Sequence, residues 1–171
     1  MTDTSAGVRT GLFIGGRERF TDAVLSVADP GKPGVVVGEA ASASASDVAD
    51  AVAAANEAFP GWSGLSPQER ARLMGDAIAG IADDRDADAA VLSQENGKIR
   101  MEAWIDALVF EIRWQLALML ADEVEQSMTL PVVPGKIPVS TEVSYRALGA
   151  VTIIVPFNWP IAILGAALPH A

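Results

Sequence analysis

A long uncharged segment, from Leu148 to Ala171, limits what this chain can fold into, because it contains no Asp, Glu, Lys or Arg. Such a segment is long enough to cross a bilayer. Pro156, Asn158 and Pro160 interrupt it, and a helix through them would leave backbone groups without hydrogen bonds in hydrocarbon. We therefore expect the segment to lie in a globular protein with no membrane partner. Membrane tethering by the C-terminus is the alternative.

The same segment has the pattern of a strand, a turn and a helix. Residues 150–155 form a continuous, largely β-branched run, which is typical of a strand buried on both faces in a parallel sheet. The turn from Pro156 to Pro160 follows, and an apolar helix begins near Ile161. This order predicts the first piece of a doubly wound, Rossmann-like fold. Because the chain ends inside that helix, we expect a truncated domain.

Composition excludes several classes of site. The 171-residue chain has 22 acidic and 12 basic residues, and its formal charge of -10 repels nucleic-acid phosphates. It has no cysteine and one histidine, which excludes a disulfide scaffold, a cysteine nucleophile within this chain and a multi-histidine metal site. The N-terminal residues lack the basic start and apolar run of a secretory signal. We expect a cytoplasmic protein that binds neither nucleic acid nor metal.

The N-terminal half predicts a small β unit followed by helices. Residues 11–20, with a Gly-Gly pair in the middle, predict a hairpin, and a further strand is expected from Val35 to Val37. Ser46 is the predicted N-cap of an amphipathic helix, and the Pro-Gly pair at 60–61 is expected to break it. A second helix should follow the capping box that begins at Ser66, and a third, short helix should end at the later Asn-Gly pair, which is a stop signal.

The longest helix is expected from Met101 to Glu125, with an apolar face that repeats every three to four residues. The predicted face comprises Trp104, Leu108, Ile112, Leu116 and Met119. Farther along, polar and apolar residues alternate from Val139 to Arg146, which predicts a half-exposed edge or extension strand.

Four stretches of this sequence resemble, in the same order, signatures of one enzyme family. LFIGGRER resembles an opening hairpin, and AFPGW followed by SPQER resembles the next signature. ENGK resembles a Glu-Thr-Gly-Lys turn, and YRALGAVTIIVPFNWP resembles the stretch that ends in Pro-Trp-Asn-Phe-Pro. Together they resemble the N-terminal part of an NAD(P)-dependent aldehyde dehydrogenase. The resemblance implies an oxidoreductase that converts an aldehyde to a carboxylic acid, with NAD or NADP as hydride acceptor.

The resemblance gives Asn158 a catalytic role. In the family, the asparagine of this turn donates its amide hydrogen to the oxyanion that forms when a cysteine thiolate attacks the aldehyde carbonyl. Such a role suits a donor that is held rigidly in a dry pocket. From the residues alone, the alternative is that Asn158 caps the helix that begins near Pro160.

The resemblance also implies that Ile154, Val155, Pro156 and Phe157 line the nicotinamide side of a cofactor site, where open α/β sheets bind ligands. Ordinary strand packing is the alternative for the isoleucine and valine side chains. Phe157 and Trp159 are swapped relative to the commonest family form. The family's nucleophilic cysteine, general-base glutamate and glycine-rich loop lie downstream of the matching region, so we expect this chain alone to be inactive.

These observations predict an α/β fold in three parts. Residues 1–130 would form the N-terminal hairpin and helical part of a cofactor-binding domain, residues 131–149 an extension strand of the oligomerisation type, and residues 150–171 the first strand, turn and helix of a dinucleotide-binding sheet. The expected function is that of an aldehyde dehydrogenase fragment. The alternative is a non-catalytic remnant or interaction protein that pairs with a full-length relative through the strand at 139–146, giving a homo- or hetero-oligomer.

Overall fold

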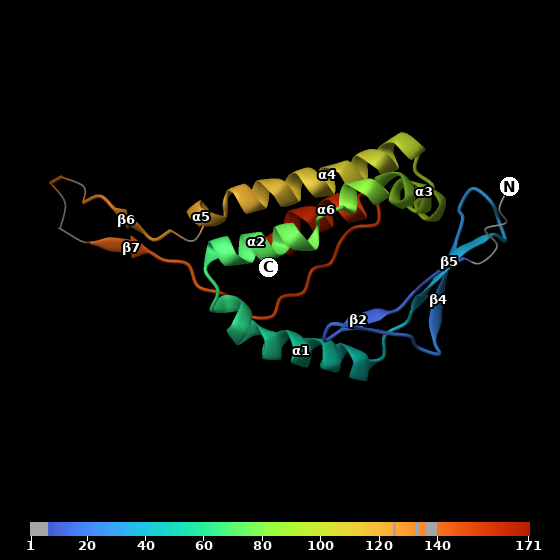
Figure 1. The fold of residues 1–171 in the computed structure, drawn as a ribbon, viewed down its shortest axis with the longest axis horizontal. Coiled ribbons are helices and arrows are strands. Elements are labelled where there is room, and N and C mark those ends of the chain that lie inside the picture. The colour runs from blue at the N-terminus through green and yellow to red at the C-terminus, as the bar shows by residue number, and fades with distance from the viewer. Residues whose placement is uncertain (1–6, 125, 133, 136–139) are drawn as a thin grey trace.

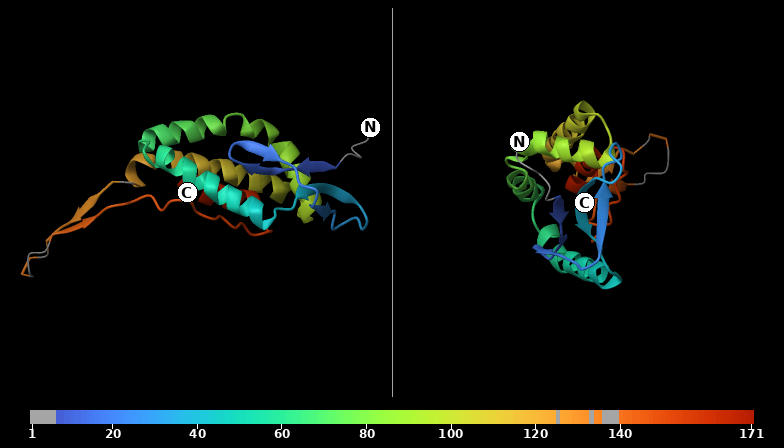
Figure 2. Two further views of the ribbon diagram at one scale, coloured as in Figure 1. Left: turned by 90° about the horizontal axis from the view of Figure 1, so that it is seen from below. Right: turned by 90° about the vertical axis from the view of Figure 1, so that its right-hand side faces the viewer.

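The protein combines a group of helices with small β elements at its two ends (Figures 1 and 2). The computed structural model describes residues 7–124, 126–132, 134–135 and 140–171. In these residues the helices lie together in the middle, a small sheet lies near the N-terminus, and a hairpin projects from the opposite end. The mixed α/β class expected from the sequence is confirmed.

The N-terminal sheet has three strands in the order β1-β5-β4. Strand β1 (Val8–Thr10) pairs parallel to β5 (Val36–Ala41), and β4 (Val24–Ala28) pairs antiparallel to β5. Gly38 is buried where β1 lies beside β5, and a side chain there would collide with the carbonyl oxygen of Val8. The strand expected at residues 35–37 is present, but it begins and ends later.

The predicted hairpin at residues 11–20 is confirmed. Strands β2 (Leu12–Ile14) and β3 (Arg17–Arg19) pair antiparallel, with Ile14 opposite Arg17. Gly15 and Gly16 form the turn with φ angles of 58° and 76°, and glycine adopts this left-handed region without steric cost.

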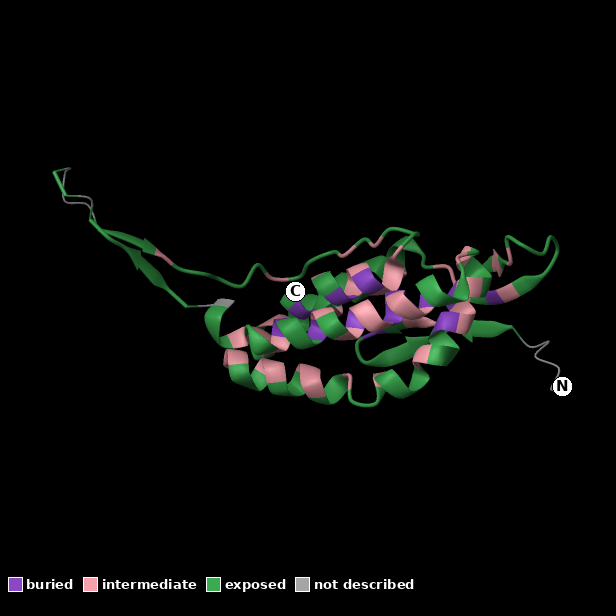
Figure 3. Cartoon of the chain, turned by 90° about the horizontal axis from the view of Figure 1, so that it is seen from above, coloured by how far each residue is buried: buried purple, intermediate pink, exposed green. Residues whose placement is uncertain are grey.

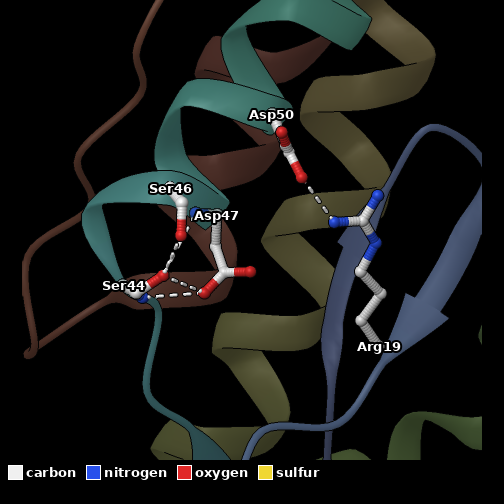
Figure 4. Close-up of polar contacts among 5 residues, drawn as sticks. All are labelled: Arg19, Ser44, Ser46, Asp47 and Asp50. Carbon is white, nitrogen blue, oxygen red and sulfur yellow. Dashed lines mark hydrogen bonds and ion pairs between the residues drawn. The ribbon is translucent and has the colours of Figure 1, made fainter.

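The first helix, α1 (Ala45–Ser63), differs from the prediction at both ends. Ser44, not Ser46, is the N-cap: its Oγ accepts a hydrogen bond from the Asp47 amide at 3.2 Å, and the Asp47 carboxylate accepts one from the Ser44 amide at 2.9 Å (Figure 4). Ser44 is favoured because Asp47 lies three residues after it, as a capping box requires. Pro60 does not break the helix but lies within its last turns, where it removes one backbone donor.

Helix α1 lies on the surface of the fold. None of its residues, all of which are described, is buried, and two valines of its apolar face, Val48 and Val52, are exposed. An ion pair between Arg19 of β3 and Asp50, with 2.8 Å between Nη1 and Oδ2, joins the helix to the hairpin (Figure 4). The apolar face of α1 is therefore only partly covered, because Phe59 is half-buried while the two valines are exposed.

The next two helices follow their predicted signals. Helix α2 (Pro67–Ala77) begins after the capping box at Ser66. After a 3₁₀ turn at Ile81–Asp84, helix α3 (Arg85–Asn96) ends at Gly97, which has a φ of 81°. Glycine is the usual residue for such a left-handed helix end.

The longest helix, α4 (Arg100–Met119), is shorter than predicted, and a short helix α5 (Ala121–Val124) follows a break at Leu120. Glu125, the predicted end, lies outside the described residues. The break occurs at the end of an apolar run, just before the acidic residues Asp122 and Glu123.

The predicted core face of α4 is largely wrong. Trp104 and Leu108 are half-buried, whereas Ile112, Leu116 and Met119 are exposed. The buried face instead contains several small residues, which allow a neighbouring helix to approach closely. It comprises Ala103, Asp106, Ala107, Phe110, Trp114 and Ala117.

Helix α6 (Pro160–Ala167) packs along this small-residue face and is followed by a 3₁₀ turn, Leu168–His170. Gly165 lies at the contact, and a Cβ there would be 2.7 Å from the Cα of Phe110. Buried positions gather where α3, α4 and α6 meet (Figure 3). The core of the described chain is therefore at this junction.

The strand expected at residues 150–155 is not formed. The segment is irregular, with Val151 and Ile154 exposed, and no strand of the described chain pairs with it. A β-branched run favours extended backbone, but it becomes a strand only when a neighbouring strand supplies the hydrogen bonds.

No helix in the described ranges is both long and apolar enough to cross a membrane.

The extension strand is present in a shorter form. Strand β7 (Thr141–Val143) pairs antiparallel with β6 (Met128–Leu130), and this hairpin projects away from the helices (Figures 1 and 3). Val139 lies outside the described residues, and residues 144–146 are not in a strand. The alternating pattern therefore predicted the type of element but not its length.

Candidate functional site

Asn158 lies in the turn between the irregular segment and α6. The N-cap of α6 is Trp159, and it makes no side-chain capping bond. The hypothesis that Asn158 caps this helix is therefore wrong. The side-chain amide of Asn158 therefore does not cap α6, and the residue is exposed to solvent.

Two residues of the Glu-Asn-Gly-Lys stretch bind the backbone of this turn. Lys98 Nζ donates a hydrogen bond to the carbonyl oxygen of Asn158 at 2.6 Å, and Asn96 Nδ2 donates one to the carbonyl oxygen of Phe157 at 2.5 Å. Lys98 Nζ also lies 4.2 Å from the centre of the Trp159 ring, within the range of a cation–π contact. Consecutive carbonyl groups of the turn are thus fixed from the α3–α4 connection.

Asp106 of α4 joins the same network from beneath. It is completely buried, and its Oδ2 lies 2.8 Å from Lys98 Nζ, which is itself almost buried. Its other oxygen, Oδ1, accepts a hydrogen bond from the Ala162 amide at 2.6 Å. The first amides of a helix have no partner within it. Asp106 therefore caps α6 across the helix interface, while Lys98 compensates its buried charge.

The Asn158 residue borders a cavity of about 450 Å³ between α4 and α6. This volume suits a small organic molecule. One cationic residue, Arg113, contributes to its wall, and most of the remaining wall is apolar. The lining residues are Ile105, Val109, Arg113, Pro156, Asn158, Trp159, Ala162 and Ile163.

The four residues expected to contact a cofactor are only partly associated with this cavity. Pro156 lines it, whereas Ile154, Val155 and Phe157 do not. Ile154 and Phe157 are 88% and 85% exposed, and Val155 is half-buried. They form an open apolar surface next to the turn.

The sequence predicts no functional role for three residues of this site. Lys98 belongs only to a turn motif of the family resemblance, and neither Asp106 nor Arg113 is in a predicted site. A signal existed for Asp106, because it is a lone acid on the small-residue face of a helix, where an unpaired carboxylate would be costly.

Within the described ranges, no group of acidic or histidine side chains could hold a metal ion.

Comparison with known proteins decides the family. The family model described as "Aldehyde dehydrogenase family" matches residues 18–171, which is most of the chain. This chain belongs to the aldehyde dehydrogenase family. Three of the four stretches that suggested it lie wholly within the matched residues, and the opening stretch, LFIGGRER, lies mostly before them.

A curated aldehyde dehydrogenase gives the sequence relationship. The chain is 34% identical over 152 residues to N-succinylglutamate 5-semialdehyde dehydrogenase 2 of Caulobacter vibrioides, an alignment that covers 88% of this chain and 30% of the relative. The chain thus spans about a third of the length of the aldehyde dehydrogenases that it matches.

Two solved structures agree with the fold. The NAD-dependent aldehyde dehydrogenase of Sinorhizobium meliloti matches with a TM-score of 0.82 and 28% identity, over 96% of this chain and 33% of that one. PnpE, solved in complex with nicotinamide adenine dinucleotide, matches with a TM-score of 0.80 and 28% identity, over 95% and 33% of the two chains. The chain is therefore similar in fold to about a third of each of these two proteins.

Proposed function

We propose that this chain provides the oxyanion-stabilising turn and one wall of the aldehyde pocket of an NAD(P)-dependent aldehyde dehydrogenase. The observation that carries the proposal is that the backbone of Asn158 is held in place beside a cavity. Its carbonyl oxygen is bound by a nearly buried lysine, and the residue borders a cavity that can hold a small molecule. A fixed backbone limits the directions in which the side-chain amide can point.

The chemistry assigned to Asn158 is electrostatic. A thiolate would attack the aldehyde carbonyl carbon, and the negative charge that develops on the carbonyl oxygen would be stabilised by the Asn158 amide N–H. The sequence has no cysteine, so the thiolate must come from outside these 171 residues. An amide suits this role because it donates a hydrogen bond without losing its proton.

The residues present fit one part of a nicotinamide cofactor. Ile154 and Phe157 offer exposed apolar surface beside Asn158, against which a flat ring could pack. When bound, NAD or NADP would accept the hydride that leaves the former carbonyl carbon as the aldehyde is oxidised. In this proposal Ile154, Val155, Pro156 and Phe157 form that side of the cofactor site, and the pyrophosphate would be bound by residues beyond this chain.

A chimera tests the proposal. Residues 18–171 would replace the matching third of the Caulobacter relative, which supplies the remaining two thirds of the fold. Asn158→Ala should then lower kcat by about 10²–10³-fold, the usual effect of removing one oxyanion donor. Gln94→Ala, a change at an exposed position of α3, is the matched control and should leave kcat unchanged. An Asn158→Ala chimera with full activity would overturn the proposed role.

The projecting hairpin supports a second proposal, that β6 and β7 contact another subunit. Nearly all of their residues are exposed, and exposed strands can pair with a strand of another chain. Replacing residues 128–143 by a short Gly-Ser linker should lower the molar mass of the chimera measured by light scattering. The same molar mass with and without the hairpin would exclude it as an oligomer contact.

A further inference from the structure

The Arg113 side chain has a charge without a described counter-ion. Its Nη1 donates a hydrogen bond to the carbonyl oxygen of Ala162 at 2.9 Å, and no carboxylate among the described residues forms an ion pair with it. Arg85 provides the contrast, because Glu111 of α4 accepts its hydrogen bonds with both carboxylate oxygens. The bond to Ala162 uses one of the five N–H donors of a guanidinium. Arg113 can therefore bind an anion while it keeps its place.

The position of Arg113 in the cavity makes this charge significant. The residue is half-buried, and it shares the wall with Ile105, Val109 and Ile163, which offer only apolar contacts. A cation beside apolar surface loses hydration that the protein does not replace. A carboxylate would replace it well, since the guanidinium fork matches the two carboxylate oxygens.

The cavity thus offers two different polar positions in an apolar wall. Asn158 supplies an amide, and Arg113 supplies a positive charge. We propose that the cavity takes an aldehyde that also carries a carboxylate, with Arg113 binding the carboxylate and Asn158 facing the aldehyde carbonyl. The short carbon chain between the two groups would lie against the aliphatic side chains. This inference rests on the proposed function, and it adds the substrate class and a specificity-determining residue.

The test compares two four-carbon aldehydes, one of which has a terminal carboxylate where the other has a methyl group. The isotope-labelled 171-residue chain is titrated with succinic semialdehyde and with butanal, and NMR follows the Arg113 Nε–H, the Asn158 side-chain amide and the Ile163 methyl resonances. We expect saturable shifts at all three positions with the semialdehyde. Its Kd should be about tenfold lower than that of butanal, as one charge-assisted contact in a partly exposed site would give.

Two variants separate binding from structural support. Arg113→Gln should abolish the tenfold preference, and Arg113→Lys, which keeps the charge but not the fork, should retain part of it. Because Arg113 also bonds to Ala162, circular dichroism and the resonances of α2 report whether each variant keeps its fold. If Arg113→Gln unfolds the chain, the wild-type and Arg113→Lys titrations still decide the question.

The outcomes separate this inference from the proposed function. Equal affinity for both aldehydes, with a shifted Asn158 amide, overturns the carboxylate preference and leaves the aldehyde pocket supported. Shifts at Arg113 without a change at Asn158, matched by plain succinate, would leave an anion site and contradict the proposed role of Asn158. An absence of saturable shifts at the three positions overturns the inference.

Discussion

The junction of α3, α4 and α6 and the surface helix α1 contain similar kinds of residue but differ in what covers them. At the junction, Ala89, Leu92 and Ala103 form a buried cluster. In α1, Val48 and Val52 follow a helical repeat but remain exposed. The difference shows that an apolar pattern identifies a face that can be buried. Whether it is buried depends on a partner that the pattern itself does not specify.

The largest effect should come from the charge at the centre of the junction. Asp106→Ala removes the counter-charge of the Lys98 ammonium and the acceptor of the Ala162 amide, and breaking a buried pair costs about 3–5 kcal/mol. Denaturant titration measures the change in the free energy of unfolding. Asp106→Asn is the control, because it removes the charge but keeps an acceptor for Ala162, and its loss should be smaller. A change below about 0.5 kcal/mol for the alanine variant would contradict the structural role.

The next effect concerns the close approach of α6 to α4. Gly165→Ala places a Cβ against the Phe110 backbone, and such overpacking typically costs about 1–3 kcal/mol. Gly61→Ala is the matched change in α1, where a Cβ meets no atom within 4 Å. There alanine should stabilise the helix by up to about 1 kcal/mol, because glycine is a poor helix former. Thermal unfolding that shifts both variants in the same direction would refute the comparison.

A smaller effect is expected at the exposed valines of α1. Val52→Ala should change the free energy of unfolding by no more than about 0.5 kcal/mol, because the side chain has little contact to lose. Denaturant titration of the 171-residue chain measures it. A loss of 2 kcal/mol or more, on the order of a buried truncation, would mean that α1 is covered in solution.

The smallest effect concerns the caps of α1 and α2. Hydrogen bonds from the Ser66 amide and hydroxyl lower the pKa of Glu69, and those from the Ser44 hydroxyl and amide lower the pKa of Asp47. A lowered pKa in the folded state means that each carboxylate stabilises its helix above its ordinary pKa. That contribution is lost as the pH falls through the lowered value. NMR titration of the carboxyl carbons should therefore give midpoints below 4.5 for Glu69 and 3.8 for Asp47. In Ser66→Ala the backbone amide of residue 66 still donates to Glu69 but the hydroxyl is lost, so the midpoint should rise only part of the way toward 4.5. An unchanged midpoint would contradict the contribution of the Ser66 hydroxyl.

The sequence by itself determined the local elements and the family. The Gly15-Gly16 turn, the capping box at Ser66 and the helix end at Gly97 depend on backbone preferences of a few adjacent residues, so each could be read directly. The motif order identified the family because several short matches occur in one sequence. Asn158 was selected by that resemblance and not by its immediate surroundings.

The tertiary structure decided which helix faces are buried and which charged side chains come together. It selected the small-residue face of α4 because Gly165 lets α6 approach there, and it left residues 150–155 without strand pairing because no neighbouring strand is present in the described chain. It also brought Lys98 and Asp106 to the Asn158 turn from sequence positions far away. Such choices depend on contacts between distant segments, whose free energy is set by geometry that no local pattern contains.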